Sequence, residues 1–175
     1  MPGKGYLFKV VVCGDTKVGK TSLILQYTEH KFSENYIYTI GSNFSVAEVL
    51  LPGNELIKLQ LWDLAGQVQF SFVRPSFYRG APVAILVYDV TRRETLKSLG
   101  NWKEEVAQCT GAATKYFVLG NKCDLEELRE VSLAEGEDTA KKLQASGFWE
   151  TSAKTGANLL VAFRTIAASF RLIHE

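Results

Sequence analysis

The sequence has no long hydrophobic run and no excess of charge, and each absence excludes a class of protein. Its longest apolar stretches are only as long as single β-strands, too short to cross a bilayer as a helix. The formal net charge of +1 gives no electrostatic basis for binding nucleic acid or an acidic membrane surface. The segment Met1–Tyr6 is too polar for a secretory signal. A cytosolic protein that binds no nucleic acid is therefore expected.

Cysteine and histidine are also scarce. Cys13, Cys109 and Cys123 lack the spacing of a metal site or a disulfide framework, which favours a reduced chain. His30 and His174 lie far apart in the sequence, so we expect ordinary surface or boundary positions for both and no histidine-based active site. A length of 175 residues, 46% of them hydrophobic, suits one domain with a substantial core.

Apolar runs alternate with helical patterns, and this order predicts an α/β fold. The expected buried strands are Leu7–Cys13, Val83–Tyr88, Tyr116–Leu119 and a short one near Phe148–Glu150. Phe44–Leu51 and Leu56–Trp62 flank the turn signal Pro52-Gly53-Asn54 and should form an antiparallel hairpin. Helices are expected after Lys20, Glu94, Ser132 and Ala157, the last with a core-facing stripe of Leu159, Phe163, Ile166, Ala167 and Phe170. We expect one domain over residues 1–175, with a six-stranded, mostly parallel sheet, one antiparallel hairpin strand and about five flanking helices.

The most specific motif is Gly14-Asp15-Thr16-Lys17-Val18-Gly19-Lys20-Thr21, which has the pattern of a phosphate-binding loop. It lies between the apolar run Val10–Val12 and a helical pattern that begins at Ser22, the strand–loop–helix context that such a loop requires. The glycines let backbone N–H groups close around a phosphate, and the following helix adds its positive N-terminal end. Lys20 offers a cation to the terminal phosphates and Thr21 a hydroxyl to Mg²⁺. The motif predicts binding of a nucleoside triphosphate.

A second motif, Asn121-Lys122-Cys123-Asp124, follows a predicted strand and indicates guanine. A carboxylate in the plane of the base accepts from guanine N1 and from its exocyclic amine, whereas adenine has no such pair of donors on that edge. An unpaired buried polar group costs about 1–3 kcal/mol, so adenine would be rejected by its missing donors. Glu150-Thr151-Ser152-Ala153-Lys154, later in the chain, strengthens this interpretation.

A third motif, Trp62-Asp63-Leu64-Ala65-Gly66-Gln67, ends the second strand of the predicted hairpin. An aspartate at a strand end can hold a water molecule on Mg²⁺. A glycine beside it lets a backbone N–H approach the γ-phosphate, and Gln67 can orient an attacking water molecule. With the other two motifs in this order, the pattern indicates hydrolysis of the nucleotide.

With these motifs in place, the chain resembles the small GTPases of the Ras superfamily and is most similar to the Rab family, from about Phe8 to about Phe170. The segments most similar to Rab proteins are Tyr38–Gly41, Trp62-Asp63, Tyr78–Ala81, Tyr88–Thr91, Gly120–Leu125 and Glu150–Lys154. The resemblance implies a P-loop G domain that switches between GTP and GDP states, hydrolyses GTP slowly with Mg²⁺ as cofactor, and regulates vesicle or membrane traffic.

The resemblance also implies a role for each matching residue. The phosphates would be held by Asp15, Thr16, Lys17, Val18, Gly19, Lys20, Thr21 and Ser22, with Lys20 reaching the β- and γ-phosphates. Thr21 and Thr39 would ligate Mg²⁺, Thr39 only in the GTP state, and Asp63 would act through water. The catalytic residues would be Gln67, Lys20 and Gly66. Phe32 would pack against guanine and Tyr36 would close over the phosphates. The base pocket would contain Asn121, Lys122, Asp124, Leu125, Ser152, Ala153 and Lys154.

The partners implied by the resemblance are effectors, an exchange factor and a GTPase-activating protein. They would contact the segments Tyr36–Phe44 and Ala65–Arg79, which the γ-phosphate and Mg²⁺ would order. No arginine in the motif loops is placed as an internal finger, so an activating protein would supply one. A monomer is expected.

Several positions depart from the Rab pattern. Lys17 replaces a small residue, and its cation either tightens nucleotide binding, crowds an activator's arginine or is simply solvated. Ser42-Asn43 in the effector segment and Val68-Gln69 after Gln67 also differ, as does Leu64. Leu64 and Val68 beside Gln67 leave open a second hypothesis, a GTP-binding interaction module with impaired hydrolysis. A third, a P-loop small-molecule kinase, would need an arginine-rich lid and would not need Asn121–Asp124.

Rab proteins continue into a lipidated C-terminal tail, which is absent after Leu172–Glu175. Either such a tail has been removed or the protein is a divergent member without a lipid anchor. Contact with the cytosolic face of membranes is expected only if a lipidated tail is missing from this chain.

Overall fold

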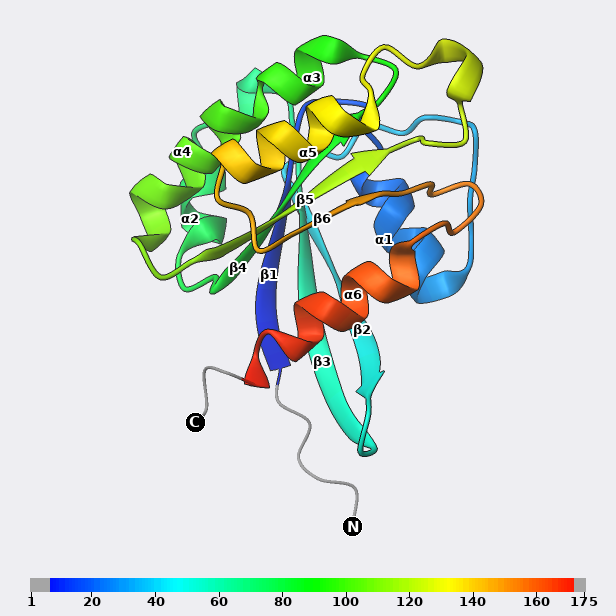
Figure 1. Cartoon of the computed structure of the whole chain (residues 1–175). Coiled ribbons are helices and arrows are strands. Elements are labelled where there is room, and N and C mark those ends of the chain that lie inside the picture. The colour runs from blue at the N-terminus through cyan, green and yellow to red at the C-terminus, as the bar shows by residue number, and fades with distance from the viewer. Residues whose placement is uncertain (1–6, 172–175) are drawn as a thin grey trace.

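A six-stranded sheet forms the centre of the computed structural model, which describes residues 7–171 (Figure 1). Across the sheet, the strands lie in the order β2 (Ser42–Leu51), β3 (Glu55–Leu64), β1 (Leu7–Cys13), β4 (Val83–Asp89), β5 (Lys115–Asn121) and β6 (Gly147–Glu150). Among the described strands only β2 and β3 pair antiparallel. The predicted sheet is therefore confirmed. The expectations for Met1–Tyr6, His174 and Leu172–Glu175 lie outside the described residues.

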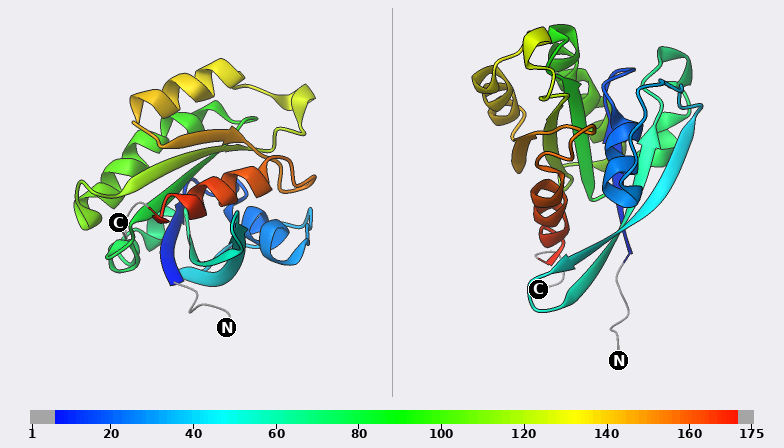
Figure 2. Two further views of the ribbon diagram at one scale, coloured as in Figure 1. Left: turned by 60° about the horizontal axis from the view of Figure 1, so that its bottom comes forward. Right: turned by 90° about the vertical axis from the view of Figure 1, so that its right-hand side faces the viewer.

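Helices cover both faces of the sheet (Figure 2). One face is covered by α1 (Lys20–Glu29) and α6 (Leu159–Ala168), and the other by α2 (Arg74–Tyr78), α3 (Arg93–Lys97), α4 (Leu99–Thr110) and α5 (Leu133–Lys142). Only Ser98 separates α3 from α4, so these two helices pack as one unit. The helices of the described residues therefore form about five packing units, as expected. Within residues 7–171, no helix combines the length and apolar character needed to cross a bilayer.

The alternation of side chains along β1 explains how one strand supplies two cores. Val10 and Val12 pack with α1 and α6, while Val11 and Cys13 pack with the helices of the opposite face. Every residue of β4 is buried, as a parallel strand covered on both faces requires. The predicted apolar stripe is confirmed, since its four members in α6 and Phe170, just after the end of this helix, are all buried in the first of these cores.

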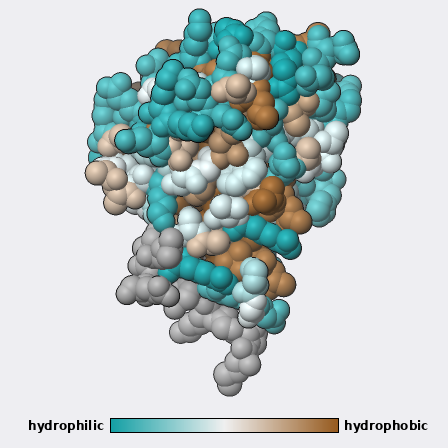
Figure 3. Space-filling model, in the orientation of Figure 1, coloured by the Kyte–Doolittle hydropathy of each residue, from teal (hydrophilic) through white to brown (hydrophobic). Residues whose placement is uncertain are grey.

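The β2–β3 hairpin is longer than its hydrophobic pattern predicts. Backbone pairing continues to Ser42 opposite Leu64, so polar positions join the ladder. Gly53 and Asn54 both have positive φ in the connecting turn, which suits these two residue types. The hairpin projects beyond the rest of the sheet (Figure 1). On the face seen in Figure 3, apolar surface gathers mainly in the lower half, in the region of α6 and the hairpin, where Leu50, Leu160 and Val161 are exposed.

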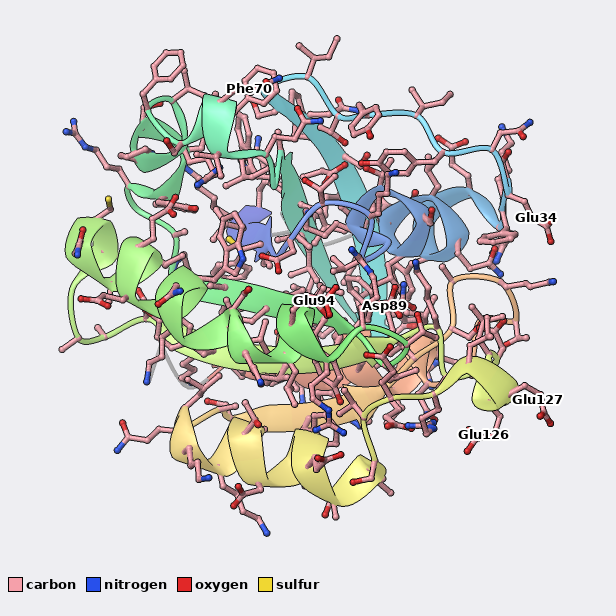
Figure 4. The ribbon with its side chains drawn as sticks, turned by 90° about the horizontal axis from the view of Figure 1, so that it is seen from above. Glu34, Phe70, Asp89, Glu94, Glu126 and Glu127 are labelled. Atoms are coloured by element: carbon pink, nitrogen blue, oxygen red, sulfur yellow. The ribbon has the colours of Figure 1, made fainter. Side chains whose placement is uncertain are left out.

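The strand order brings the three motifs together. The phosphate-loop motif follows β1, the Asp63–Gln67 segment ends β3, and Asn121 ends β5. Because β1, β3, β4 and β5 run parallel, their carboxyl ends meet at one edge of the sheet. Figure 4 views the molecule from this edge.

Candidate nucleotide-binding site

A cavity of about 790 Å³ lies at the carboxyl edge of the sheet, a volume typical of a small-molecule site. Most of the residues predicted for the nucleotide line it, although they come from separate segments of the chain. These are Thr16, Lys17, Gly19, Lys20, Thr21, Ser22, Phe32, Tyr36, Thr39, Gly66, Gln67, Asn121, Lys122, Asp124, Leu125, Ala153 and Lys154.

Four predicted residues, Asp15, Val18, Asp63 and Ser152, are not among those that line the cavity. Val18 is buried in the core below the loop. The Asp15 carboxylate accepts from the indole N–H of Trp102 at 2.8 Å. Ser152 is buried and donates to Asp124 at 2.6 Å. The side chains of Asp15, Val18 and Ser152 therefore support the cavity wall instead of facing the ligand space, and the motif pattern alone does not show this distinction.

Three side chains from other segments hold the phosphate loop in shape. Arg92 Nη2 donates to the carbonyl of Thr16 at 2.8 Å, Lys122 Nζ to that of Lys17 at 2.8 Å, and Asn121 Nδ2 to that of Val18 at 2.9 Å. The C=O and N–H of one planar trans peptide point in opposite directions. The N–H groups of Val18 and Gly19 therefore point away from these donors, as a phosphate-binding loop requires.

Lys20 is the buried cation of the site. Its Nζ donates to the carbonyls of Gly14 and Asp15 at 2.8 and 2.9 Å. Burial lowers the pKa of Lys20 to about 8, and the nearby charge of Asp63 opposes this shift. The negative charge of a bound phosphate would favour the protonated form further. Gly19 gives the loop its close contact with β5, since a Cβ there would lie 2.2 Å from Asn121 Nδ2.

Asp89 is a buried site residue that the sequence analysis did not assign. It lies near the centre of the view in Figure 4 and its carboxylate contacts Lys122 at 2.7 Å and Arg92 at 3.3 Å. Although burial raises it, hydrogen bonds from Lys122 and Thr91 hold the pKa of Asp89 below its usual value. Asp89 thus orients both cations that bind the loop carbonyls. In the sequence, Asp89 ends an apolar strand and lies within the Rab-like segment Tyr88–Thr91, but neither feature assigned it a role.

Thr21, Thr39 and Asp63 converge at one point although they belong to α1, the segment before β2, and β3. The Thr21 hydroxyl bonds to Asp63 Oδ2, and the Thr39 hydroxyl lies 2.9 Å from that of Thr21. Asp63 Oδ1 is buried with no hydrogen-bond partner in the described part of the chain, and burial raises the pKa of this carboxyl. Two hydroxyls and a carboxylate are oxygen ligands of the kind Mg²⁺ prefers, so these residues fit the predicted metal.

Asp124 also lines the cavity, and the loop after β6 sets its position. Ser152 bonds to Asp124 Oδ1, and the backbone N–H of Ala153 donates to Asn121 Oδ1 at 3.3 Å. Lys154 forms an exposed ion pair with Glu34 at 3.2 Å, at the outer edge of the site in Figure 4. This pair joins the two sides of the cavity mouth.

Gly66 lies directly against the phosphate loop. A Cβ at this position would be 2.5 Å from the carbonyl oxygen of Gly14 and 2.7 Å from the backbone nitrogen of Thr16. The preceding Ala65 donates its N–H to the carbonyl of Gly41 at 3.0 Å, which connects the two predicted switch segments. The side chain of Gln67 accepts from Gln69 Nε2 at 3.0 Å.

Lys17 is an exposed residue of the phosphate loop with φ of 66°, in the left-handed region. Its ammonium lies 5.4 Å from the ring centroid of Tyr36 and 5.6 Å from that of Tyr38, and the two rings pack edge to face. Lys17 therefore connects the loop to the segment before β2, which contributes Tyr36 to the cavity lining. This geometry favours tighter nucleotide binding among the roles considered for this lysine.

Lys17→Gln is expected to speed GDP release about fivefold, because each cation–π contact at an exposed site contributes roughly 0.5–1 kcal/mol. Tyr38→Leu should speed release less, about two- to fivefold, because the contact between Lys17 and Tyr36 remains. The double variant should release GDP about as fast as Lys17→Gln. Stopped-flow release of a fluorescent GDP analogue measures the rate. Lys142→Gln, which removes an exposed lysine of α5 paired with Asp138, is the control. Equal rates for the wild type and both single variants would contradict this role.

Comparison with known proteins agrees with the geometry of the site. The model of the Ras family matches residues 9–172. The chain is 40% identical over 164 residues to Ras-related protein RABA5c of Arabidopsis thaliana, a match that covers 94% of this chain and 76% of that protein. The chain therefore belongs to the Ras family and is a Rab-like small GTPase.

Proposed function

We propose that the protein is a guanine-nucleotide switch that binds GTP or GDP with Mg²⁺ and hydrolyses GTP slowly. The observation that supports this most is that one cavity is lined by both the braced phosphate loop and Asp124. Guanine offers two donors to that carboxylate, and the loop offers N–H groups to the phosphates.

The proposed mechanism depends on positioning and charge, since phosphoryl transfer needs little covalent work from the protein. Lys20 would contact the β- and γ-phosphates, the Gly66 N–H the γ-phosphate, and Gln67 the attacking water. Mg²⁺, when bound at Thr21, Thr39 and Asp63, supplies charge neutralisation. No arginine is found among the described residues that line the cavity. This supports slow intrinsic turnover and an arginine donated by an activating protein, worth about 10³–10⁵-fold in this class.

The two switch segments, Tyr36–Phe44 and Ala65–Arg79, are the proposed surface for effectors, the exchange factor and the activator. Ile37 and Ile40 on the first, and Val68 and Phe72 on the second, expose most of their side chains to solvent. Exposed apolar groups of this kind mark protein-binding surfaces. The Rab-like character supports a role in vesicle or membrane traffic, at the cytosolic face of membranes.

A second candidate is a GTP-binding interaction module with impaired hydrolysis. The observation that favours it is the hydrogen bond from Gln69 to the side-chain oxygen of Gln67. A Gln67 held in this way must be released before it can orient water. Val68, which also departs from the Rab pattern, lies between these two glutamines and is itself highly exposed.

The deciding experiment starts by denaturing the purified protein and identifying the released nucleotide. GTP is then loaded, and phosphate release is followed in a single turnover with Mg²⁺ for the wild type and Gln67→Leu. Released GDP and a rate at least about tenfold higher for the wild type are expected, because the variant cannot orient water. A wild-type rate equal to that of the variant would favour the interaction module, and bound adenine nucleotide would contradict the guanine assignment.

A further inference from the structure

Arg74 is a buried cation that belongs to none of the nucleotide-binding motifs. It is the first residue of α2, and only 4% of its surface is exposed. Its Nε and Nη2 donate to the Glu105 carboxylate of α4 at 2.6 and 3.0 Å, and the Tyr78 hydroxyl donates to the same carboxylate at 2.8 Å. The planar fork of a guanidinium suits this two-point contact, which fixes the orientation of Arg74.

The remaining nitrogen of Arg74 faces the loop after β3. Nη1 donates to the carbonyl of Ala65 at 3.1 Å and to that of Gln67 at 3.0 Å. The carbonyl of Ala65 and the N–H of Gly66 belong to one peptide unit and point in opposite directions. The bond to Ala65 therefore turns the Gly66 N–H away from Arg74. The bond to the Gln67 carbonyl fixes the backbone from which the Gln67 side chain projects.

Arg74 also has a connection to the phosphate loop. Its guanidinium carbon lies 4.6 Å from the centroid of the Trp102 ring, and the indole N–H of Trp102 donates to Asp15 at 2.8 Å. Both Arg74 and Trp102 contact elements of the site from the α4 side of the sheet. The same guanidinium thus joins the loop after β3, helix α4 and, through Trp102, the phosphate loop.

We propose that Arg74 is a positioning residue for GTP hydrolysis, which presents the Gly66 N–H and the Gln67 backbone to the γ-phosphate site from inside the chain. This role is separate from that of an arginine donated by an activator, because Arg74 is directed at backbone carbonyls and not at the cavity. The inference rests on the proposed roles of Gly66 and Gln67.

The test compares single-turnover hydrolysis of preloaded GTP in the wild type, Arg74→Met, Arg74→Lys and Gln67→Leu, with GDP release and thermal stability measured alongside. Arg129→Met is the matched control. Arg129 also donates twice to a carboxylate, that of Glu150 at 2.7 and 2.9 Å, and once to a backbone carbonyl, that of Val131 at 2.9 Å. Its Nε also donates to the carboxylate of Glu126 at 2.9 Å. Arg129→Met therefore loses the same kinds of bond, at residues that belong neither to the phosphate loop nor to the segment after β3.

Arg74→Met is expected to slow hydrolysis about 10- to 100-fold, because a displacement of about 1 Å at a reacting centre reduces rates by up to that factor. GDP release should stay within about twofold, since GDP lacks the γ-phosphate. Arg74→Lys should be intermediate, because one ammonium cannot reproduce the fork. Arg129→Met should lower thermal stability while hydrolysing bound GTP at the wild-type rate.

Two results would overturn the inference: a wild-type rate in the Arg74 variants, or an equal loss of rate in Arg129→Met, which would reduce Arg74 to a purely structural role. If Arg74→Met does not fold, Arg74→Lys decides between these outcomes. A wild-type rate in Gln67→Leu would instead contradict the proposed function, so the two failures are distinguishable.

Discussion

Asp124→Asn is expected to weaken guanine nucleotide binding about 10²–10⁴-fold, because two hydrogen bonds to a charged acceptor are lost and each contributes roughly 1.5–3 kcal/mol. Binding of xanthine nucleotides should improve, since the new amide can donate to the xanthine oxygen at the corresponding position. The pocket should keep its shape, because the amide oxygen can still accept the hydrogen bond from Ser152. Competition between GDP and xanthosine diphosphate for a fluorescent guanine nucleotide measures both effects.

The matched control for this change is Asp138→Asn. Asp138 lies on α5, where its carboxylate pairs with Lys142 at 2.7 Å on the exposed surface. The same chemical change there should leave both affinities unaltered, because an exposed ion pair contributes little. An unchanged preference for guanine in Asp124→Asn would remove Asp124 from the base pocket.

Gly66→Ala is expected to slow single-turnover GTP hydrolysis about 10²-fold. The added methyl group would meet the carbonyl oxygen of Gly14 at 2.5 Å and the backbone nitrogen of Thr16 at 2.7 Å. Both are backbone atoms of the phosphate loop, so the strain is relieved only if residue 66 moves away from the γ-phosphate site. GDP release should change little, because GDP has no γ-phosphate to contact this residue.

Gly100→Ala provides the control for a glycine substitution without a clash. Gly100 lies in α4, and a Cβ there would meet no atom within 4 Å. This variant should keep the wild-type rate and gain up to about 1 kcal/mol of stability, since alanine is the better helix former. Hydrolysis at the wild-type rate in both variants would show that the contact between Gly66 and the phosphate loop is not needed for turnover.

Helix α2 could not be predicted from the sequence pattern. Residues 74–78 contain a proline and no helical repeat of apolar residues, so no helix was predicted there. In the structure Arg74 and Tyr78 are both buried against α4 and share Glu105 as their partner. This short helix depends on tertiary contacts, because five residues are too few to form a stable helix in isolation.

The boundary of the site was likewise only partly predictable. Most of the residues predicted for the nucleotide line the cavity, but the motifs did not separate them from Asp15, Val18 and Ser152, which support its wall, and did not indicate lining residues such as Leu25 and Lys31. The pairing of β4 with β5 brings Asp89 and Lys122 together. The sequence of β4 alone does not indicate that β5 is its neighbour, so this ion pair could not be predicted.

Short contiguous patterns were sufficient for the sheet, the phosphate loop and the family resemblance, because strand periodicity and a glycine-rich turn are properties of neighbouring residues. Packing between distant segments was needed to place Lys17 beside Tyr38, and Arg74 beside Glu105, 31 residues away. Such contacts depend on where whole elements cross in space. The nucleotide motifs can therefore be located in the sequence, whereas the side chains that hold those motifs in working geometry become visible only in the folded chain.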